Sequence, residues 1–347
     1  MTMPPPTVLD YPFAAAPPPG AVIEVAPRML WLRMPLPFAL DHINLWLLRE
    51  RDGFALVDCG YGDAPTRELW TRHFATTMGG APITRIIATH YHPDHLGNAA
   101  WLAQRFGCTV AMTQAEFLGA HAIHDQRATH AMADTCALFR QHGMADEHLD
   151  ALAGRGNHYK RGVPEIPQRF ARMIAGDIVT AGGTEWQVIP GFGHSPEHAA
   201  LFAAAPGVLI SGDMLLPKIT TNVAVWPAEP DGDPLARFLA SQQAFEGLPP
   251  ATLVLPSHGL PFRGIPLRVA QLRAHHAARL EELAAAIAAA AVPQSAVDVL
   301  PVLFRRPLDL QQRFFAMGEA IAHLNHLWRA GRVKRLAAPD GALRFAA

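Results

Sequence analysis

The sequence predicts an α+β fold in which helices pack on β-sheets. Apolar runs typical of strands alternate with stretches of helical spacing, in the order β-β-α-β-α over residues 21 to 106. Half of the 347 residues are apolar, which is enough to build a large core. Polar clusters directly follow several predicted strands, where open α/β sheets place their sites.

The predicted elements begin after a leader formed by residues 1–20, which is rich in proline and alanine and is expected to be flexible. Strands are expected in AVIEVAPRMLWLRMP and in INLWLLRERDGFALVDCG, with a turn at Arg51-Asp52-Gly53. A helix in APTRELWTRHFATTM, a strand in ITRIIAT and a helix in LGNAAWLAQRF follow. Residues 110–175 have helical spacing, many histidines and methionines and no clear strand, and we interpret them as a helical insertion.

The later elements complete one domain and predict a second. Strands are expected in TEWQVIPGFG, AALFAAA, GVLISGD and TLVLPSHG, with a helix from Pro234 to Phe245. The first domain is therefore expected to span residues 21–265, and a connecting helix residues 266–292. Residues 293–347 contain two helical patterns and two short strands around Pro339-Asp340-Gly341, an order typical of a winged-helix unit.

Composition excludes several classes of protein. The net charge of −1 gives no overall attraction to nucleic acid or to an anionic membrane. The longest apolar run, at residues 283 to 292, is shorter than the roughly 20 residues of a membrane span. Cys59, Cys108 and Cys136 are odd in number and widely spaced, which predicts reduced thiols. We therefore expect a soluble, cytoplasmic protein; its oligomeric state is open, with a homodimer as one alternative.

Residues 89 to 98, THYHPDHLGN, suggest a metal site. His90, His92, Asp94 and His95 offer imidazole and carboxylate ligands that suit Zn²⁺, Fe or Mn²⁺. His90 and His92 alternate on extended backbone and point the same way, whereas Pro93 turns the chain and could direct Asp94 and His95 elsewhere. One segment could therefore serve two ions. Ordinary polar turn residues are the alternative, but four ligand types in six positions favour metal binding.

Three later stretches could supply the remaining ligands. His194 lies in GFGHSPEHAALF, Asp213 ends the apolar run LISGD, and His258 follows the strand VLPSHG. A carboxylate at the end of a buried strand needs a cation or several donors to offset its desolvation, so Asp213 is the expected bridging ligand. A role for Asp213 as a cap or turn residue is the alternative.

These residues resemble the motifs of the metallo-β-lactamase superfamily. The segment from His90 to His95 is similar to its HxHxDH signature, and Asp58 in LVDCG to its early aspartate motif. The resemblance covers roughly Ala21 to Ile265 and implies an αββα four-layer sandwich with two metal ions at one edge. It assigns His90, His92 and His194 to the first ion, Asp94, His95 and His258 to the second, and Asp213 as the bridge. The ligand set is similar to that of glyoxalase II and its hydrolase relatives.

The resemblance also implies a supporting role for Asp58, which would orient a ligand histidine through its ring N–H. His198, four residues after His194, is either a support of this kind or structural. Tyr91 and Asn98 flank the signature and could line a pocket, although simple packing is the favoured interpretation.

The expected chemistry is hydrolysis. Two divalent ions, Zn²⁺ with Fe or Mn²⁺ as alternatives, could share a bridging hydroxide and polarise a carbonyl or phosphoryl oxygen. Asp94 would orient the hydroxide and accept its proton. By resemblance the substrate would be a small thioester or a related activated acyl compound. The insertion would be a lid over the metal edge, with packing or dimerisation as its alternative.

Two other functions remain as alternatives. A phosphodiesterase or endoribonuclease could use residues 293–347, which hold eight basic residues against four acidic ones. The helix AIAHLNHLW is as apolar as it is basic, which favours packing against the first domain. A metal centre without hydrolytic activity is a third hypothesis. It is disfavoured because no flavin-binding segment is found and every expected ligand is present.

Overall fold

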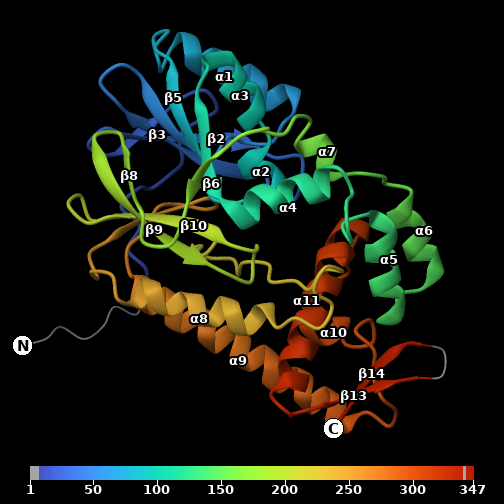
Figure 1. Cartoon of the computed structure of the whole chain (residues 1–347). Coiled ribbons are helices and arrows are strands. Elements are labelled where there is room, and N and C mark those ends of the chain that lie inside the picture. Colours follow the sequence, from blue (N-terminus) through green and yellow to red (C-terminus); the bar gives the residue numbers. More distant parts are fainter. Residues whose placement is uncertain (1–7, 339–340) are drawn as a thin grey trace, which may run out of the picture.

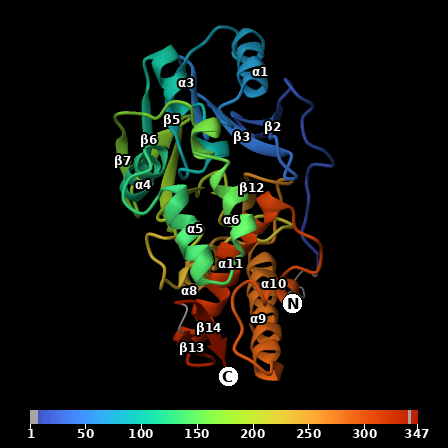
Figure 2. The same ribbon diagram turned by 90° about the vertical axis from the view of Figure 1, so that its right-hand side faces the viewer.

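The computed structural model describes residues 8–338 and 341–347 and has four layers, with two β-sheets packed face to face between two layers of helices (Figure 1). The expected α+β, αββα sandwich is confirmed. Helices α1 (Ala64–Ala75) and α3 (Ala99–Phe106) cover the outer face of the first sheet, and α8 (Pro234–Glu246) and α9 (Ile265–Ala289) cover that of the second. Helices of the insertion and of the C-terminal segment meet at one end of the sandwich (Figure 2).

The first sheet keeps chain order: β1 (Ile23–Ala26), β2 (Met29–Pro35), β3 (His42–Arg49), β4 (Phe54–Val57), β5 (Ile83–Ile87), β6 (Thr109–Thr113) and β7 (Ala171–Met173). The strands of the second sheet are β8 (Ile178–Ala181), β9 (Thr184–Gly191), β10 (His198–Ala203), β11 (Val208–Gly212) and β12 (Leu253–Pro256). Parallel pairing from β4 to β7, and between β11 and β12, brings the carboxyl ends of these strands to common edges. These edges carry the candidate site.

The core between the sheets is formed by large apolar side chains from both of them. Trp31 of β2 and Trp46 of β3 stack with their ring centroids 6.1 Å apart, and Trp186 of β9 faces them from the second sheet within the same buried cluster. All three are fully buried. Strands β4, β11 and β12 are buried along their whole length, which explains their largely apolar sequences.

The helices of the sandwich are α1 (Ala64–Ala75), α2 (Pro93–Leu96), α3 (Ala99–Phe106), α8 (Pro234–Glu246) and α9 (Ile265–Ala289). Local signals explain where they begin. The carboxylates of Asp63 and Asp233 cap α1 and α8 by accepting hydrogen bonds from the first turn, and a proline follows each cap. No helix in the described part of the chain has the length and apolar character needed to cross a bilayer.

The helical insertion differs from its prediction at both ends. Its helices are α4 (Gln114–His124), α5 (Met132–Gln141), α6 (Asp146–Ala153) and α7 (Tyr159–Gly162). The expected absence of strands is wrong, because residues 110–175 include nearly all of β6 and the whole of β7, which pair in parallel in the first sheet. Strand β7 has three residues, two of them exposed, so it lacks an apolar run that the sequence could reveal.

The leader also differs from its prediction over residues 8–20. Leu9 is only 8% exposed and belongs to the core beneath the second sheet. Asp10 pairs with Arg263 through backbone hydrogen bonds, and the ring of Phe13 packs edge-on against Trp31 with the centroids 6.1 Å apart. Apolar residues between the prolines therefore attach this segment to the sandwich. Residues 1–7 lie outside the described part.

The C-terminal segment contains α10 (Leu300–Leu303), α11 (Leu310–Arg329) and the antiparallel strands β13 (Lys334–Ala337) and β14 (Leu343–Ala346). Residues 339 and 340 of the expected turn are not among those described. The face of α11 that holds Met317, Ile321 and Leu324 is fully buried in the main core. The winged-helix assignment stays a prediction.

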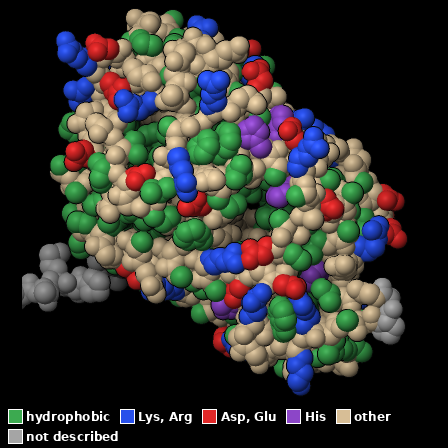
Figure 3. Space-filling view, in the orientation of Figure 1, with side chains coloured by type: hydrophobic (Ala, Val, Ile, Leu, Met, Phe, Trp, Pro, Cys, Tyr) green, Lys and Arg blue, Asp and Glu red, His purple; other side chains and the backbone are tan. Residues whose placement is uncertain are grey.

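The basic side chains of this segment are largely engaged within the molecule. Arg305 pairs with Glu282, Arg332 with Glu281 and Arg335 with Asp231. Figure 3 shows acidic and basic side chains interspersed on one face of the molecule, including the part below the sandwich. This arrangement favours packing and solvation of these charges over a surface that grips phosphates.

Candidate metal centre

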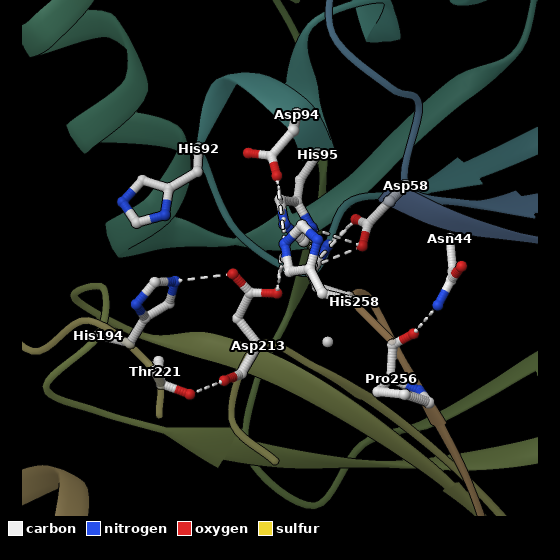
Figure 4. Close-up of polar contacts among 12 residues, drawn as sticks. Asn44, Asp58, His92, Asp94, His95, His194, Asp213, Thr221, Pro256 and His258 are labelled. Atoms are coloured by element: carbon white, nitrogen blue, oxygen red, sulfur yellow. Dashed lines mark hydrogen bonds and ion pairs between the residues drawn. The ribbon is translucent and has the colours of Figure 1, made fainter. Parts of the chain in front are cut away.

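The candidate site lies where loops from both sheets meet (Figure 4). The segment after β5 carries His90, His92, Asp94 and His95, with Pro93 as the first residue of α2. The second sheet contributes three residues, each just beyond a strand end: His194 follows β9, Asp213 follows β11 and His258 follows β12. The site is therefore built on the rigid edges of two sheets, although its residues span 169 positions of sequence.

The structure brings together all seven residues expected to be ligands, in two groups. His90, His92, His194 and Asp213 form one, and Asp94, His95 and His258 form the other. Within each group the potential ligand atoms lie within 4.8 Å of one another.

Asp213 belongs to the first group and also faces the second (Figure 4). Its Oδ2 is 3.2 Å from Nε2 of His194, and its Oδ1 is 3.5 Å from Nε2 of both His95 and His258. Within the second group, Asp94 lies on the side of His258 opposite Asp213, with Oδ2 3.4 Å from Nε2 of His258. Its other oxygen points away from His95 and His258, and the Asp94 side chain is 18% exposed.

The hydrogen bonds of three histidines leave Nε2 directed into the site. Nδ1 of His95 donates to Asp58, Nδ1 of His194 to the Asn222 carbonyl oxygen and Nδ1 of His258 to the His42 carbonyl oxygen, each over 2.8 Å. A proton held on Nδ1 leaves the Nε2 lone pair for a metal ion. Nε2 of His95 and Oδ1 of Asp213 are buried without any hydrogen-bond partner among the described residues.

Electrostatics differ between the two groups. Burial and the neighbouring imidazoles hold the pKa of His90 well below its usual range and lower that of His92 to about 3, which favours the neutral, ligating form. Burial also opposes protonation of His95 and His258, but the carboxylates outweigh it and raise the pKa of His258 to about 10. Buried carboxylates that attract protons this strongly would also attract a divalent cation. The residues therefore fit metal ions.

Asp58 is placed where it can orient His95. The residue is 1% exposed and adopts a left-handed backbone conformation with φ of 59°. Its Oδ1 accepts a hydrogen bond of 2.8 Å from the Thr89 backbone N–H, while Oδ2 accepts the hydrogen bond from His95. The Thr89 hydroxyl also bonds to this carboxylate and lies 3.1 Å from Nδ1 of His90. Asp58 and Thr89 thus connect the ends of β4 and β5.

His198 lies behind the site, outside both groups. It is fully buried, and its Nε2 accepts a hydrogen bond of 3.2 Å from the Asp213 backbone N–H. Gly212 makes this contact possible, because a Cβ at residue 212 would lie 2.2 Å from Nε2 of His198 and φ is 53°. His198 therefore supports the backbone that presents Asp213.

Sequence reasoning missed several residues that hold the site in place. Asn44 accepts hydrogen bonds from Trp31 and Arg33 and donates to the Pro256 carbonyl oxygen over 2.8 Å, which fixes the loop that carries His258. The Thr221 hydroxyl donates to the Asp213 carbonyl oxygen. Glu116 and Tyr159 hydrogen-bond to the backbone of Tyr91, which lies between His90 and His92. Their partners are distant in sequence, so no local pattern indicated them.

Other residues noted in the sequence serve packing. Asn98 is fully buried and donates to the Tyr61 carbonyl oxygen over 2.7 Å. Tyr91 is 7% exposed and belongs to the core of the first sheet. In the insertion, Phe117 stacks on Phe170, and Phe139 is fully buried in the main core.

Comparison with solved structures gives two similar proteins that align along nearly their whole length. A beta-lactamase domain protein from Burkholderia ambifaria is 47% identical, with 97% of this chain and 98% of that chain covered and a TM-score of 0.90. A metallo-beta-lactamase family protein from Thermus thermophilus is 29% identical, with 93% and 99% covered and a TM-score of 0.78.

Two further relatives are more distant. The probable metallo-hydrolase YqjP of Bacillus subtilis is 24% identical over 303 residues, which are 85% of this chain and 91% of that protein. A hydroxyacylglutathione hydrolase of Idiomarina loihiensis is 23% identical over 177 residues, covering 51% of this chain and 48% of the relative. The model of the metallo-beta-lactamase-like C-terminal domain matches residues 280–347, and that of the metallo-beta-lactamase superfamily matches residues 39–258. The chain belongs to the metallo-β-lactamase superfamily.

Proposed function

We propose that this protein is a dinuclear metal-dependent hydrolase whose substrate is a small thioester or a related activated acyl compound. The position of Asp213 carries the proposal. Its two oxygens face different histidines, Oδ2 towards His194 and Oδ1 towards His95 and His258. A carboxylate shared in this way suits two neighbouring cations, with His90, His92 and His194 on one side and Asp94, His95 and His258 on the other.

Two divalent cations held by these residues, with Zn²⁺ as the first choice and Fe or Mn²⁺ as alternatives, would supply an acidified water and polarise the oxygen of the scissile carbonyl. Asp94 is the expected proton acceptor because its side chain is more exposed than that of Asp213 and one of its oxygens is directed away from the histidines. Asp58 would keep His95 in the ligating tautomer and orientation.

The choice of an acyl substrate rests on two supports. The ligand set is similar to that of glyoxalase II, and the chain resembles a hydroxyacylglutathione hydrolase over 177 residues. That relative is matched over 48% of its length, so glutathione itself is not carried over to this protein. The ion pairs of Arg305, Arg332 and Arg335 support a small-molecule substrate over RNA.

Metal analysis combined with a substrate panel tests the proposal. The purified protein should contain close to two zinc, iron or manganese ions per chain. Asp213→Asn should lose metal and activity together, while Asp58→Asn should weaken metal binding about 10- to 100-fold. The panel should include acyl-coenzyme A and glutathione thioesters, lactones, phosphodiesters and RNA. Absence of bound metal would refute the metal centre, and cleavage of RNA but not of thioesters would refute the acyl assignment.

A further inference from the structure

Two buried side chains of the helical insertion contact residues that lie next to the candidate ligands His90, His92 and His194. We infer that Glu116 of α4 and Tyr159 of α7 are positioning residues that fix the geometry of His90, His92 and His194. This inference rests on the proposed function, because it concerns how the proposed first metal group is held. It gives the insertion a role at the site that differs from that of a lid.

Glu116 joins the two loops that carry this group. Its side chain is fully buried, and Oε2 accepts a hydrogen bond of 2.9 Å from the Tyr91 backbone N–H. Oε1 accepts hydrogen bonds of 2.6 Å from the Ser195 hydroxyl and 2.7 Å from the Glu197 backbone N–H. Tyr91 lies between His90 and His92, and Ser195 directly follows His194. One carboxylate therefore links the segment after β5 in the first sheet to the loop after β9 in the second.

The chemistry of Glu116 favours a positioning role over simple space filling. No ion pair identified within residues 8–338 and 341–347 includes this carboxylate, and burial raises its pKa to about 7 despite its three hydrogen bonds. Burying a carboxylate without a cation is costly unless its hydrogen bonds are made. An apolar side chain would fill the same space without that cost. What it could not do is accept hydrogen bonds from both loops.

Tyr159 completes the arrangement from the other side of Tyr91. Its hydroxyl donates a hydrogen bond of 2.6 Å to the Tyr91 carbonyl oxygen, and the residue is 4% exposed. The backbone N–H of Tyr91 is bound by Glu116 and its carbonyl oxygen by Tyr159, so the insertion holds the peptide units on both sides of this residue. Tyr91 lies in the bend of the chain between β5 and α2, directly between His90 and His92. The two side chains therefore control the relative orientation of two candidate ligands.

The second metal group is held by other parts of the chain. His95 is oriented by Asp58 at the end of β4, and His258 by the His42 carbonyl oxygen of β3. Loss of Glu116 or Tyr159 should consequently affect the two groups unequally. This inequality separates positioning from a general contribution to folding.

The test is a metal titration of the metal-free full-length protein, with Co²⁺ and Zn²⁺ as probes and the two sites resolved by stepwise binding and by Co²⁺ absorption. In Glu116→Gln, an amide N–H₂ group faces at least one of the hydrogen-bond donors that the carboxylate accepts from. The metal affinity of the first site should therefore fall about 10- to 100-fold, while that of the second site should change by no more than about threefold. Tyr159→Phe should also lower the metal affinity of the first site, by a smaller factor. Glu147→Gln, the same change at an exposed position of α6, is the matched control and should alter neither site.

A second measurement does not depend on metal. Amide hydrogen exchange of the metal-free protein should be faster at Tyr91 and Glu197 in Glu116→Gln than in the wild type, with the core strands unchanged. Equal affinity of wild type and Glu116→Gln at both sites, or equal weakening of both sites with faster exchange throughout the core, would overturn the inference. If the wild type binds no metal, the proposed function fails, and the exchange pattern alone then decides whether Glu116 holds the two loops.

Discussion

Gly212 shows how a single backbone position controls the presentation of Asp213. Its φ of 53° lies in the left-handed region, where only glycine is free of strain. A Cβ there would also approach Nε2 of His198 to 2.2 Å and the side chain of Thr89 to 3.4 Å. His198 accepts the hydrogen bond from the Asp213 backbone N–H, so any side chain at residue 212 would displace the residue that faces both metal groups.

Gly212→Ala should therefore impair metal binding as well as stability. Gly207 provides a matched control, because its φ of 64° is similar but nothing lies within 4 Å of an added Cβ. Gly207→Ala should lower the free energy of unfolding by about 1–2 kcal/mol through backbone strain alone. Gly212→Ala should lower it further and bind fewer than two ions per chain. Urea unfolding and metal analysis of both variants measure this, and equal effects would show that the contact with His198 is unimportant.

The candidate ligands were accessible to sequence reasoning because their signal is local. Four of them fall within six positions, and Asp213 and His258 follow buried strands whose apolar sequences are easy to identify. The supporting residues carry no such signal. Asn44 contacts a carbonyl group 212 positions later, and Glu116 binds Ser195 and Glu197 across 79 and 81 positions. Only the folded chain reveals why a polar side chain is required at these places.

At the scale of elements, long apolar strands and capped helices were predicted well, whereas β6, β7 and β8 were missed. All three are short and partly exposed, and β7 is recognisable only through its parallel pairing with β6. The packing of the leader was also missed, because its apolar residues Leu9 and Phe13 lie in a segment rich in proline and alanine, a composition typical of flexible chain. The pairing of short strands and the packing of the leader depend on contacts between residues distant in sequence, so the local spacing of apolar residues does not predict them.

The interface between α9 and α11 contains a pair of buried histidines that should make stability depend on pH. Nδ1 of His276 lies 3.4 Å from Nε2 of His323, and Nδ1 of His323 donates to the Glu319 carbonyl oxygen. Both residues are 1% exposed. Burial lowers the pKa of His276 to about 3 and that of His323 to about 4, with His275 and His326 adding like charge when protonated.

These shifts determine the sign of the effect. Both histidines stay neutral in the folded protein, whereas in the unfolded chain they take up protons below their ordinary pKa of about 6.5. Their contribution to stability is therefore complete above pH 6.5 and is lost as the pH falls towards 4. In that pH range, each histidine should lower the free energy of unfolding by up to about 1.4 kcal/mol for each unit by which the pH falls. His276→Asn, which cannot titrate, should show a shallower slope than the wild type in urea unfolding of metal-free protein at pH 7.5, 6 and 5. Identical slopes would contradict the assignment.

At the scale of the whole molecule, the candidate ligands connect the two halves of the sandwich. His90, His92, Asp94 and His95 belong to the first sheet, whereas His194, Asp213 and His258 belong to the second. Each metal group draws on both sheets. Bound ions would therefore act as cross-links between layers that are otherwise joined by the apolar core around Trp31, Trp46 and Trp186.

Removal of metal should consequently lower the thermal stability of the whole sandwich. A ligand that binds only the folded state stabilises it by about 2.7 kcal/mol when its free concentration is a hundred times its dissociation constant. Because each kcal/mol moves the midpoint by about 2–4 °C in a domain of roughly this size, chelation should lower the midpoint by about 5 °C or more. Asp213→Asn, which removes the shared carboxylate, should unfold at the same temperature with and without chelator. Calorimetry of both proteins decides the point: a wild-type midpoint that is unchanged by chelation would mean that bound metal does not help to hold the two sheets together.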